Sequence, residues 1–441
     1  NNGIITGQGA NRGGVVLSVI NTPTFAPIMD PFQPEQYYTN FYGVNITSPL
    51  ENIARSERNK NRENRIVGST SATIKFTPWL NFKSSFALDR RNAVSTTFLD
   101  PLSTSWGRNQ YGEGSDARNI NTLTTFDNVL TYQKTFGKHQ VEAMAGSSWT
   151  SSLYSNNWVK ATHYRNNLIE TLNVANKINW GDTGSGASQW AIMSYFGRFS
   201  YNYDSKYLIT ANMRTDGSSK LHPDHRWGVC PSVSAAWRLS AEDFLSDVSW
   251  LNDLKIRGGW GQTGNQSGLG DYSYLTMYNL RRLEWFLAGQ ENILPTVSAA
   301  NLRTGDLTWE TTTQTNIGVD FTAFNNRLTV NLDYYNKQTK DMLMIVTLPS
   351  SGSAVANTIN RNEGAMSNRG FEANVNSKNL VGDFAWSTDF NISFNRNTVK
   401  SFALQQIYNT ATTSDFVNET VVRNEPGRAL SGFYGYISDG V

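Results

Sequence analysis

The 441-residue chain is rich in aromatic side chains, at 12%, and carries only 17% charged residues, against roughly 25% in a typical soluble domain. Its 38 Lys and Arg against 36 Asp and Glu give a net charge of +2, which excludes a basic nucleic-acid-binding face as its main theme. The aromatic content excludes intrinsic disorder. The single Cys230 excludes an internal disulfide and a Cys-based zinc site. No run approaches 18 apolar residues, so a membrane role would need a β-barrel.

Apolar and polar residues alternate with period two along the whole chain, whereas helical periodicity is nearly absent. This pattern predicts strands throughout, and it recurs around residues 82–88, 229–237, 254–260, 317–321, 328–334 and 384–395. In the last of these, Phe390, Ile392 and Phe394 alternate with Asn391 and Ser393. Each such strand has one apolar face and one polar face.

The connections between these strands alternate between tight and long. Tight turns are expected at 77–80, 136–139, 203–206, 324–327 and 380–383, and a short helical connection at 240–252. Long ones are expected at 91–118, 153–188, 264–307 and 341–365, and one of intermediate length at 215–226. The five tight turns and the helical connection make six hairpins, which predict twelve strands between about residues 66 and 397. Further strands at 13–20 and 429–437 would bring the number to about fourteen.

In an antiparallel meander, alternate connections lie at the same end, so one end carries short turns and the other large loops. That asymmetry is typical of an outer-membrane β-barrel with short periplasmic turns and long extracellular loops. An antiparallel transmembrane β-barrel is therefore the predicted fold class. The apolar face would then meet lipid, through residues that include Val330, Leu332, Phe390, Ile392 and Phe394. A soluble or surface all-β protein, such as a carbohydrate-binding module or an adhesin, is the alternative.

Ten short segments follow one another along the chain: Asn45–Leu50, Asn59–Arg62, Ser194–Arg198, Arg214–Lys220, Arg226–Gly228, Pro231–Arg238, Leu254–Arg257, Trp260–Asn265, Leu307–Glu310 and Asn368–Glu372. In this order they resemble signatures of the SusC/RagA-type TonB-dependent outer-membrane transporters. The resemblance spans nearly all 441 residues. It implies localisation in the outer membrane of a Gram-negative cell and a barrel of 22 strands, of which residues 1–441 would be the central part. The signal peptide, N-terminal β-domain, TonB box, plug and C-terminal strands are then expected outside this sequence.

The resemblance also implies a function: active import of large oligomers, either glycan fragments or peptides. The implied partners are a SusD-like surface lipoprotein, the lipid bilayer and TonB, which would act through a segment absent here. A dimer of such two-protein units is a further implied possibility. No cofactor and no enzymatic activity are expected.

Aromatic residues of the long connections are the candidate substrate-binding residues, because exposed rings among amides suit sugar rings or extended peptides. The candidates are Trp106, Tyr111, Trp158, Trp180 and Trp285. The competing interpretation is that these rings pack the loops on one another or on a partner protein. The pair His222 and His225 is better explained as a solvated turn than as a metal site, and no residue pair predicts catalysis.

Overall fold

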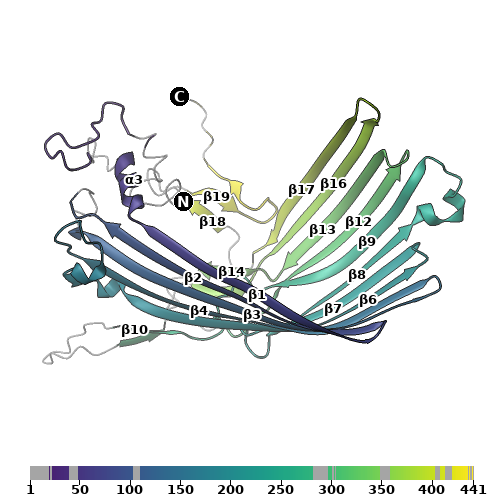
Figure 1. The fold of residues 1–441 in the computed structure, drawn as a ribbon, viewed down its shortest axis with the longest axis horizontal. Coiled ribbons are helices and arrows are strands. Elements are labelled where there is room, and N and C mark those ends of the chain that lie inside the picture. Colours follow the sequence, from purple (N-terminus) through teal and green to yellow (C-terminus); the bar gives the residue numbers. More distant parts are fainter. Residues whose placement is uncertain are drawn as a thin grey trace. The chain divides into compact units, whose positions relative to one another are not determined.

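A computed structural model describes residues 19, 22–38, 48–102, 110–281, 296–299, 302, 304–347, 358–402, 408–412, 420–435, 437 and 440. These residues form mainly strands, together with the short helix α3 (Pro49–Glu57) and a few 3₁₀ turns (Figure 1). Twelve long strands follow one path of antiparallel neighbours in chain order. They are β1 (Lys60–Thr77), β2 (Leu80–Leu99), β3 (Glu113–Phe136), β4 (His139–Thr162), β6 (Gly184–Tyr203), β7 (Tyr207–Ser218), β8 (Trp227–Arg238), β9 (Leu251–Asn265), β12 (Glu310–Ala323), β13 (Leu328–Lys340), β16 (Ala365–Leu380) and β17 (Trp386–Ser401).

The chain divides into two compact units. The first comprises Asn1–Ser69, Ala87–Thr124 and Ser152–Gln189. It contains the parts of β1 to β4 next to the long connections, together with helix α3 (Pro49–Glu57) and the small elements between β4 and β6. These elements are η1 (Leu172–Val174), β5 (Lys177–Ile178) and η2 (Trp180–Asp182), and β5 pairs with the end of β4.

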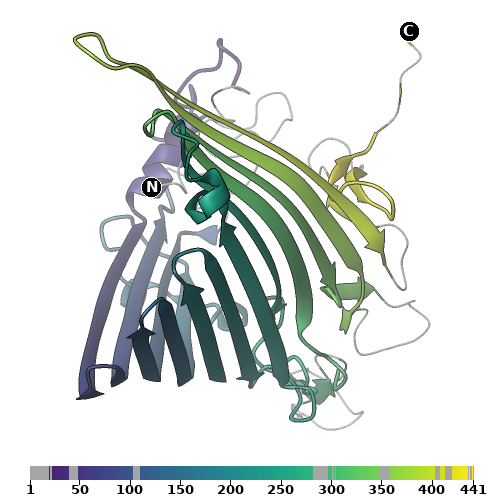
Figure 2. The same cartoon turned by 90° about the vertical axis from the view of Figure 1, so that its right-hand side faces the viewer.

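The second unit comprises Thr70–Phe86, Thr125–Ser151 and Trp190–Val441. Its strands from β9 to β17 run side by side, as the green and yellow-green ribbons of Figure 2 show. The remaining elements of this unit belong to the connections and the C-terminal part. They are η3 (Leu239–Ala241), η4 (Asp243–Leu245), β10 (Tyr278–Arg281), β11 (Thr296–Ala299), β14 (Leu343–Thr347), β15 (Thr358–Asn362), β18 (Tyr408–Thr412), β19 (Thr420–Asn424) and β20 (Gly432–Phe433).

The alternation of tight and long connections is confirmed. Residues 78–79, 137–138, 204–206, 324–327 and 381–385 join consecutive strands directly. Several turn residues have the left-handed backbone conformation: φ is 58° at Gly137 and 61° at Asn326. Gly adopts this conformation without steric cost, and Asn more readily than most other residues. These local preferences explain why the tight turns could be read from the sequence.

The first two long connections are shorter than predicted, because the strands that flank them extend further. β2 and β3 enclose residues 100–112 rather than 91–118, and β4 and β6 enclose 163–183 rather than 153–188. The predicted short helix at 240–252 consists of the two 3₁₀ turns η3 and η4. Of the further strands, the one at 13–20 lies outside the described residues except for Val19, and the one at 429–437 is represented by the two residues of β20.

Within the described residues, the buried hydrophobic cluster lies among the long connections rather than across the sheet. Leu221, Leu269 and Leu307 are at most 4% exposed and pack together, with Trp309 and Leu343 against them. The sheet itself has large exposed apolar side chains along its strands. No helix in the described part of the chain is both long and apolar enough to cross a membrane.

Candidate functional site

One face of the sheet is apolar in continuous rows, because the strand register aligns the apolar positions of neighbouring strands. Ile392 pairs with Ala373, Ala373 with Leu332, and Leu332 with Val319. Two parallel rows flank this one: Leu254, Phe321, Val330, Val375 and Phe390, and Gly258, Ile317, Tyr334, Phe371 and Phe394. All five residues named for lipid contact therefore lie in these rows.

These rows are open to the surroundings. Phe390, Ile392 and Phe394 are 53%, 37% and 60% exposed, and Val330 and Leu332 are half-buried. Isolated exposed apolar residues are ordinary on soluble proteins, but a contiguous face of this kind marks a contact with a partner or with lipid. We therefore interpret this face as the outer surface of a membrane-embedded wall.

Aromatic side chains border the apolar face at both ends of β8. At the tight-turn end, the rings of Tyr203, Tyr207 and Trp237 stack in sequence, with centroids 6.3 Å apart in each pair. At the other end, Tyr195 stacks on Trp227 at 6.1 Å. The ten steps from Trp227 to Trp237 cover about 33 Å of strand, at about 3.3 Å per residue. With the usual barrel tilt this spans about 25 Å, the height of the apolar band of an outer-membrane barrel.

Glu242, in the turn between η3 and η4, holds the aromatic border at the tight-turn end. The Tyr207 hydroxyl donates to its Oε1 at 2.7 Å and the Trp237 indole N–H at 3.1 Å, and Lys206 Nζ lies 3.1 Å from Oε2. These hydrogen bonds, that from Tyr207 above all, lower the pKa of the Glu242 carboxyl from its ordinary value of 4.5. The carboxylate therefore favours the folded turn.

The Glu242→Gln variant should lose the pH dependence of this turn. Because the pKa of Glu242 is lower in the folded state, its stabilisation is fully present above pH 4.5 and is lost as the pH falls through the folded-state pKa. Hydrogen exchange of residues 239–250 should be slower in the wild type than in the variant near neutral pH, and equal in acid. The Asp243→Asn variant is the control, since Asp243 is solvent-exposed and 4.0 Å from Lys206. Equal pH dependence in all three proteins would contradict this role.

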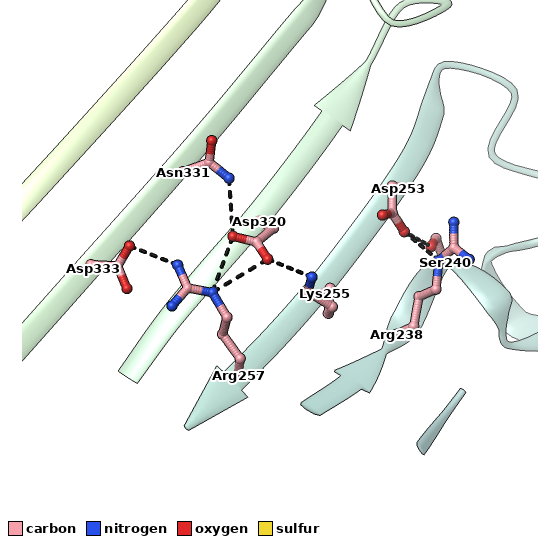
Figure 3. A network of polar contacts seen from close by, with 8 residues as sticks. All are labelled: Arg238, Ser240, Asp253, Lys255, Arg257, Asp320, Asn331 and Asp333. Carbon is pink, nitrogen blue, oxygen red and sulfur yellow. Dashed lines mark hydrogen bonds and ion pairs between the residues drawn. The ribbon is translucent and has the colours of Figure 1, made fainter. Parts of the chain in front are cut away.

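The opposite face of β9, β12 and β13 carries a network of charged and amide side chains (Figure 3). Asp320 lies at its centre: Lys255 Nζ is 2.8 Å and Arg257 Nε 3.2 Å from its carboxylate, and Asn331 donates to it at 3.0 Å. Arg257 also reaches Asp333 on the next strand, at 2.7 Å from Nη2 to Oδ2. The charges are balanced within the network. Such a face suits the wet interior of a barrel, where charge needs no desolvation.

A second, smaller group of this network lies nearer to the tight-turn end (Figure 3). Arg238 Nε lies 2.6 Å from the Asp253 carboxylate, which also accepts a hydrogen bond from the Ser240 hydroxyl at 2.7 Å. Ser240, at the start of the helical connection, thus bonds a side chain of the next strand. This contact ties the helical connection to β9.

Gly318 lets Arg257 lie across β12 to reach Asp333. A Cβ atom at Gly318 would stand 2.6 Å from Arg257 Cζ and 2.7 Å from Asp333 Oδ1. Contacts this short are not compatible with the observed positions of these groups, so the cross-strand ion pair depends on the missing side chain.

The structure describes three of the five candidate substrate-binding aromatics. Trp180 lies in η2 and is 76% exposed. Tyr111 is 64% exposed and stacks on His163 at 5.0 Å. Trp158 lies within strand β4 rather than in a loop, and its indole lies across the backbone of Gly184. Trp106 and Trp285 lie outside the described residues.

No ring contact joins Tyr111, Trp158 and Trp180 to one another within the described residues. The described residues also contain no group of three or more His, Cys, Asp and Glu placed to hold a metal ion. His222 and His225 flank a turn, in which the N–H of His225 donates to the carbonyl of His222. Tyr164, just after the end of β4, is buried, and this burial raises the pKa of its hydroxyl.

The long strands form one antiparallel meander, and the chain belongs to the family of TonB-dependent outer-membrane β-barrel receptors. The family model described as TonB dependent receptor-like, beta-barrel matches residues 10–436. Members of the family are outer-membrane transporters rather than enzymes, which confirms the predicted fold class and localisation. The alternative of a soluble all-β protein is wrong.

Among its relatives, the chain is 33% identical to TonB-dependent receptor P39 of Formosa agariphila, over 88% of this chain and 36% of that protein. It is 31% identical to TonB-dependent receptor SusC of Bacteroides thetaiotaomicron, over 81% of this chain and 35% of SusC. The solved structure of the RagAB peptide transporter shares the fold, with a TM-score of 0.73 at 22% identity over 89% of this chain and 42% of that chain. The chain thus spans well under half the length of these relatives.

Proposed function

We propose that this chain forms part of the wall and the outer loops of a transporter that actively imports large oligomers, glycan fragments or peptides, across the outer membrane. The observation that carries the proposal is the two-faced sheet. Its apolar face is bordered by aromatic residues at both ends, and its opposite face carries the balanced network around Asp320. A wall with these two faces separates lipid from an aqueous passage.

The proposed passage is energised by TonB and covered by a SusD-like surface lipoprotein, in an assembly that can dimerise. The likeness to SusC and to the RagAB peptide transporter supports these partners. Both substrate classes stay open in this proposal, since RagAB is a peptide transporter. The plug and the TonB-binding segment are proposed to belong to the remaining length of a protein of the relatives' size.

In this proposal, the short turns face the periplasm and the long connections face the outside. Val330, Leu332, Phe390, Ile392 and Phe394 contact lipid. The candidates for substrate contact are Trp106, Tyr111, Trp158, Trp180 and Trp285. For Tyr111 and Trp180, the exposure of the ring supports this role. Stacking of exposed aromatic rings on sugar or peptide groups is the expected mode of contact.

Uptake by intact cells tests the proposal. Cells that produce the full-length transporter and its lipoprotein should accumulate fluorescently labelled oligosaccharides or oligopeptides that are too large for diffusive porins. A strain that lacks the transporter should not. Collapse of the proton gradient with an uncoupler should abolish accumulation, because TonB draws on that gradient. Accumulation that survives the uncoupler, or that does not require the transporter, would contradict active import.

A further inference from the structure

Strands β8 and β9 stop pairing with each other towards the long connections. Their register runs from Arg238↔Lys255 to Ser232↔Gly261, although β8 continues to Trp227 and β9 to Asn265. The register ends beside Pro231, which has no N–H to donate to a ladder. Each strand keeps its other neighbour: β8 stays paired with β7 as far as Trp227, and β9 with β12 as far as Asn265.

Trp309 occupies the space between the diverging strands. Its indole lies against the backbone of both Gly228 and Gly264, where an added Cβ would come within 2.9 Å and 3.0 Å of the ring. Its Nε1 donates to the carbonyl of Arg226 at 2.8 Å. One aromatic side chain thus fills a place where no backbone ladder is formed.

A cavity of about 530 Å³ opens beside Trp309, lined among others by Trp190, Arg214, Asp216, Lys220 and Gln266. Its size falls in the range of small-molecule binding sites. It combines two indole side chains with polar groups from β7 and from the connections that follow β7 and β9. Sites that bind sugar rings need this combination of flat apolar surface and hydrogen-bonding groups.

The charges of the cavity are compensated by neighbouring protein groups. Arg214 Nε lies 2.8 Å from the Asp216 carboxylate, which also accepts a hydrogen bond from Ser194. Lys220 Nζ lies 3.1 Å from Asp271 and 5.5 Å from the centroid of the Trp190 ring. A ligand in this cavity therefore meets no excess charge, which favours a neutral ligand over an anionic one.

Two hydrogen-bonding groups at the cavity are left for a ligand. Gln266 Oε1 is buried and accepts no hydrogen bond within the described residues. Arg214 uses Nε and Nη2 for Asp216 and Ser194, and its Nη1 has no such bond to the described residues. A buried acceptor without a donor is unfavourable. A sugar hydroxyl can accept from Arg214 Nη1, and it can donate to Gln266 Oε1 once this side chain turns toward the cavity, since the observed Oε1 has no exposed surface.

We propose that this cavity is a subsite for one neutral sugar ring of a glycan chain. The inference rests on the proposed import function and selects the glycan alternative within it. The ring lies against the indole of Trp190, and its hydroxyl groups bond Gln266 Oε1 and Arg214 Nη1.

Binding to the purified full-length transporter with its lipoprotein tests this subsite. The probes are fluorescently labelled neutral glucan, mannan and galactan oligosaccharides, with uronic-acid oligosaccharides and a peptide library for comparison. The Gln266→Ala and Trp190→Ala variants should each weaken binding of the preferred neutral glycan by about tenfold, the effect of losing one well-formed contact. Gln262→Ala and Trp260→Ala are matched controls on β9, outside this cavity, and should bind as the wild type does.

Heat-modifiable migration on gels first establishes that each variant is folded, and if Trp190→Ala is not, Gln266→Ala alone decides. Unchanged glycan affinity in the cavity variants would overturn the subsite but leave import intact. Binding of peptides only, or of anionic glycans only, would do the same. Absence of binding to every probe class, together with absence of uptake, would overturn both the subsite and the proposed function.

Discussion

Replacing Ile392 with Arg should prevent most of the protein from assembling in the outer membrane. Ile392 lies in the middle of the three apolar rows, paired with Ala373. An Arg on the lipid face of a barrel costs about 2–4 kcal/mol near the bilayer midplane and less near an interface. The fraction of heat-modifiable, folded full-length protein in outer-membrane preparations measures the effect.

The neighbouring Asn391 provides the matched control for this substitution. It lies on the opposite face of β17 and pairs with Asn374. An Arg at this position would extend into the aqueous interior, so Asn391→Arg should assemble nearly as well as the wild type. Equal loss in both variants, or equal tolerance of both, would show that the two faces are not divided between lipid and water as proposed.

Replacing Gly318 with Ala should break the ion pair between Arg257 and Asp333 and destabilise the sheet. The new methyl group would overlap both partners, and overpacking of this kind costs about 1–3 kcal/mol. The temperature at which the purified, detergent-solubilised full-length protein unfolds should fall measurably. An Arg257→Ala change made in the Gly318→Ala background should recover part of the loss, because it removes the side chain that the methyl group displaces.

Gly258 serves as the control, because it pairs with Ile317, one residue away from Gly318 on β12. A Cβ at Gly258 would have no atom among its nearest neighbours closer than 3.8 Å. Gly258→Ala should therefore leave the unfolding temperature almost unchanged. If the two variants unfolded at the same temperature, the close approach of Arg257 to the backbone at Gly318 would have no energetic importance.

The strand pattern was predictable because it is local. Alternation at Phe390, Ile392 and Phe394 assigns one face without knowledge of any partner strand, and the register then places these residues beside Val375, Ala373 and Phe371. The tight turns were predictable for the same reason, since Gly137 and Asn326 suit the backbone that each turn requires.

The end of the sheet next to the long connections was less predictable, because the strands there continue beyond the alternating segments. Trp158 was assigned to a loop, yet β4 extends to Thr162 and the ring packs on Gly184. The cavity beside Trp309 was not predicted at all. Its groups come from β4, β6, β7, β9 and the connections that follow β7 and β9, and no sequence spacing reports that Trp190 and Gln266 line one space.

Because β8 and β9 do not pair beyond Ser232 and Gly261, the connections that they carry share no backbone ladder. Residues 219–226 are carried by β7 and β8, whereas residues 266–309 are carried by β9 and β12. Above Ser232 and Gly261, displacing one group of residues relative to the other breaks no β8–β9 ladder. Side chains hold the two groups together instead: Trp309 bonds Arg226, Lys220 pairs with Asp271, and Leu221 packs with Leu269 and Leu307. Movement of one connection against the other must therefore break these side-chain contacts, whereas the wall below keeps its backbone ladder.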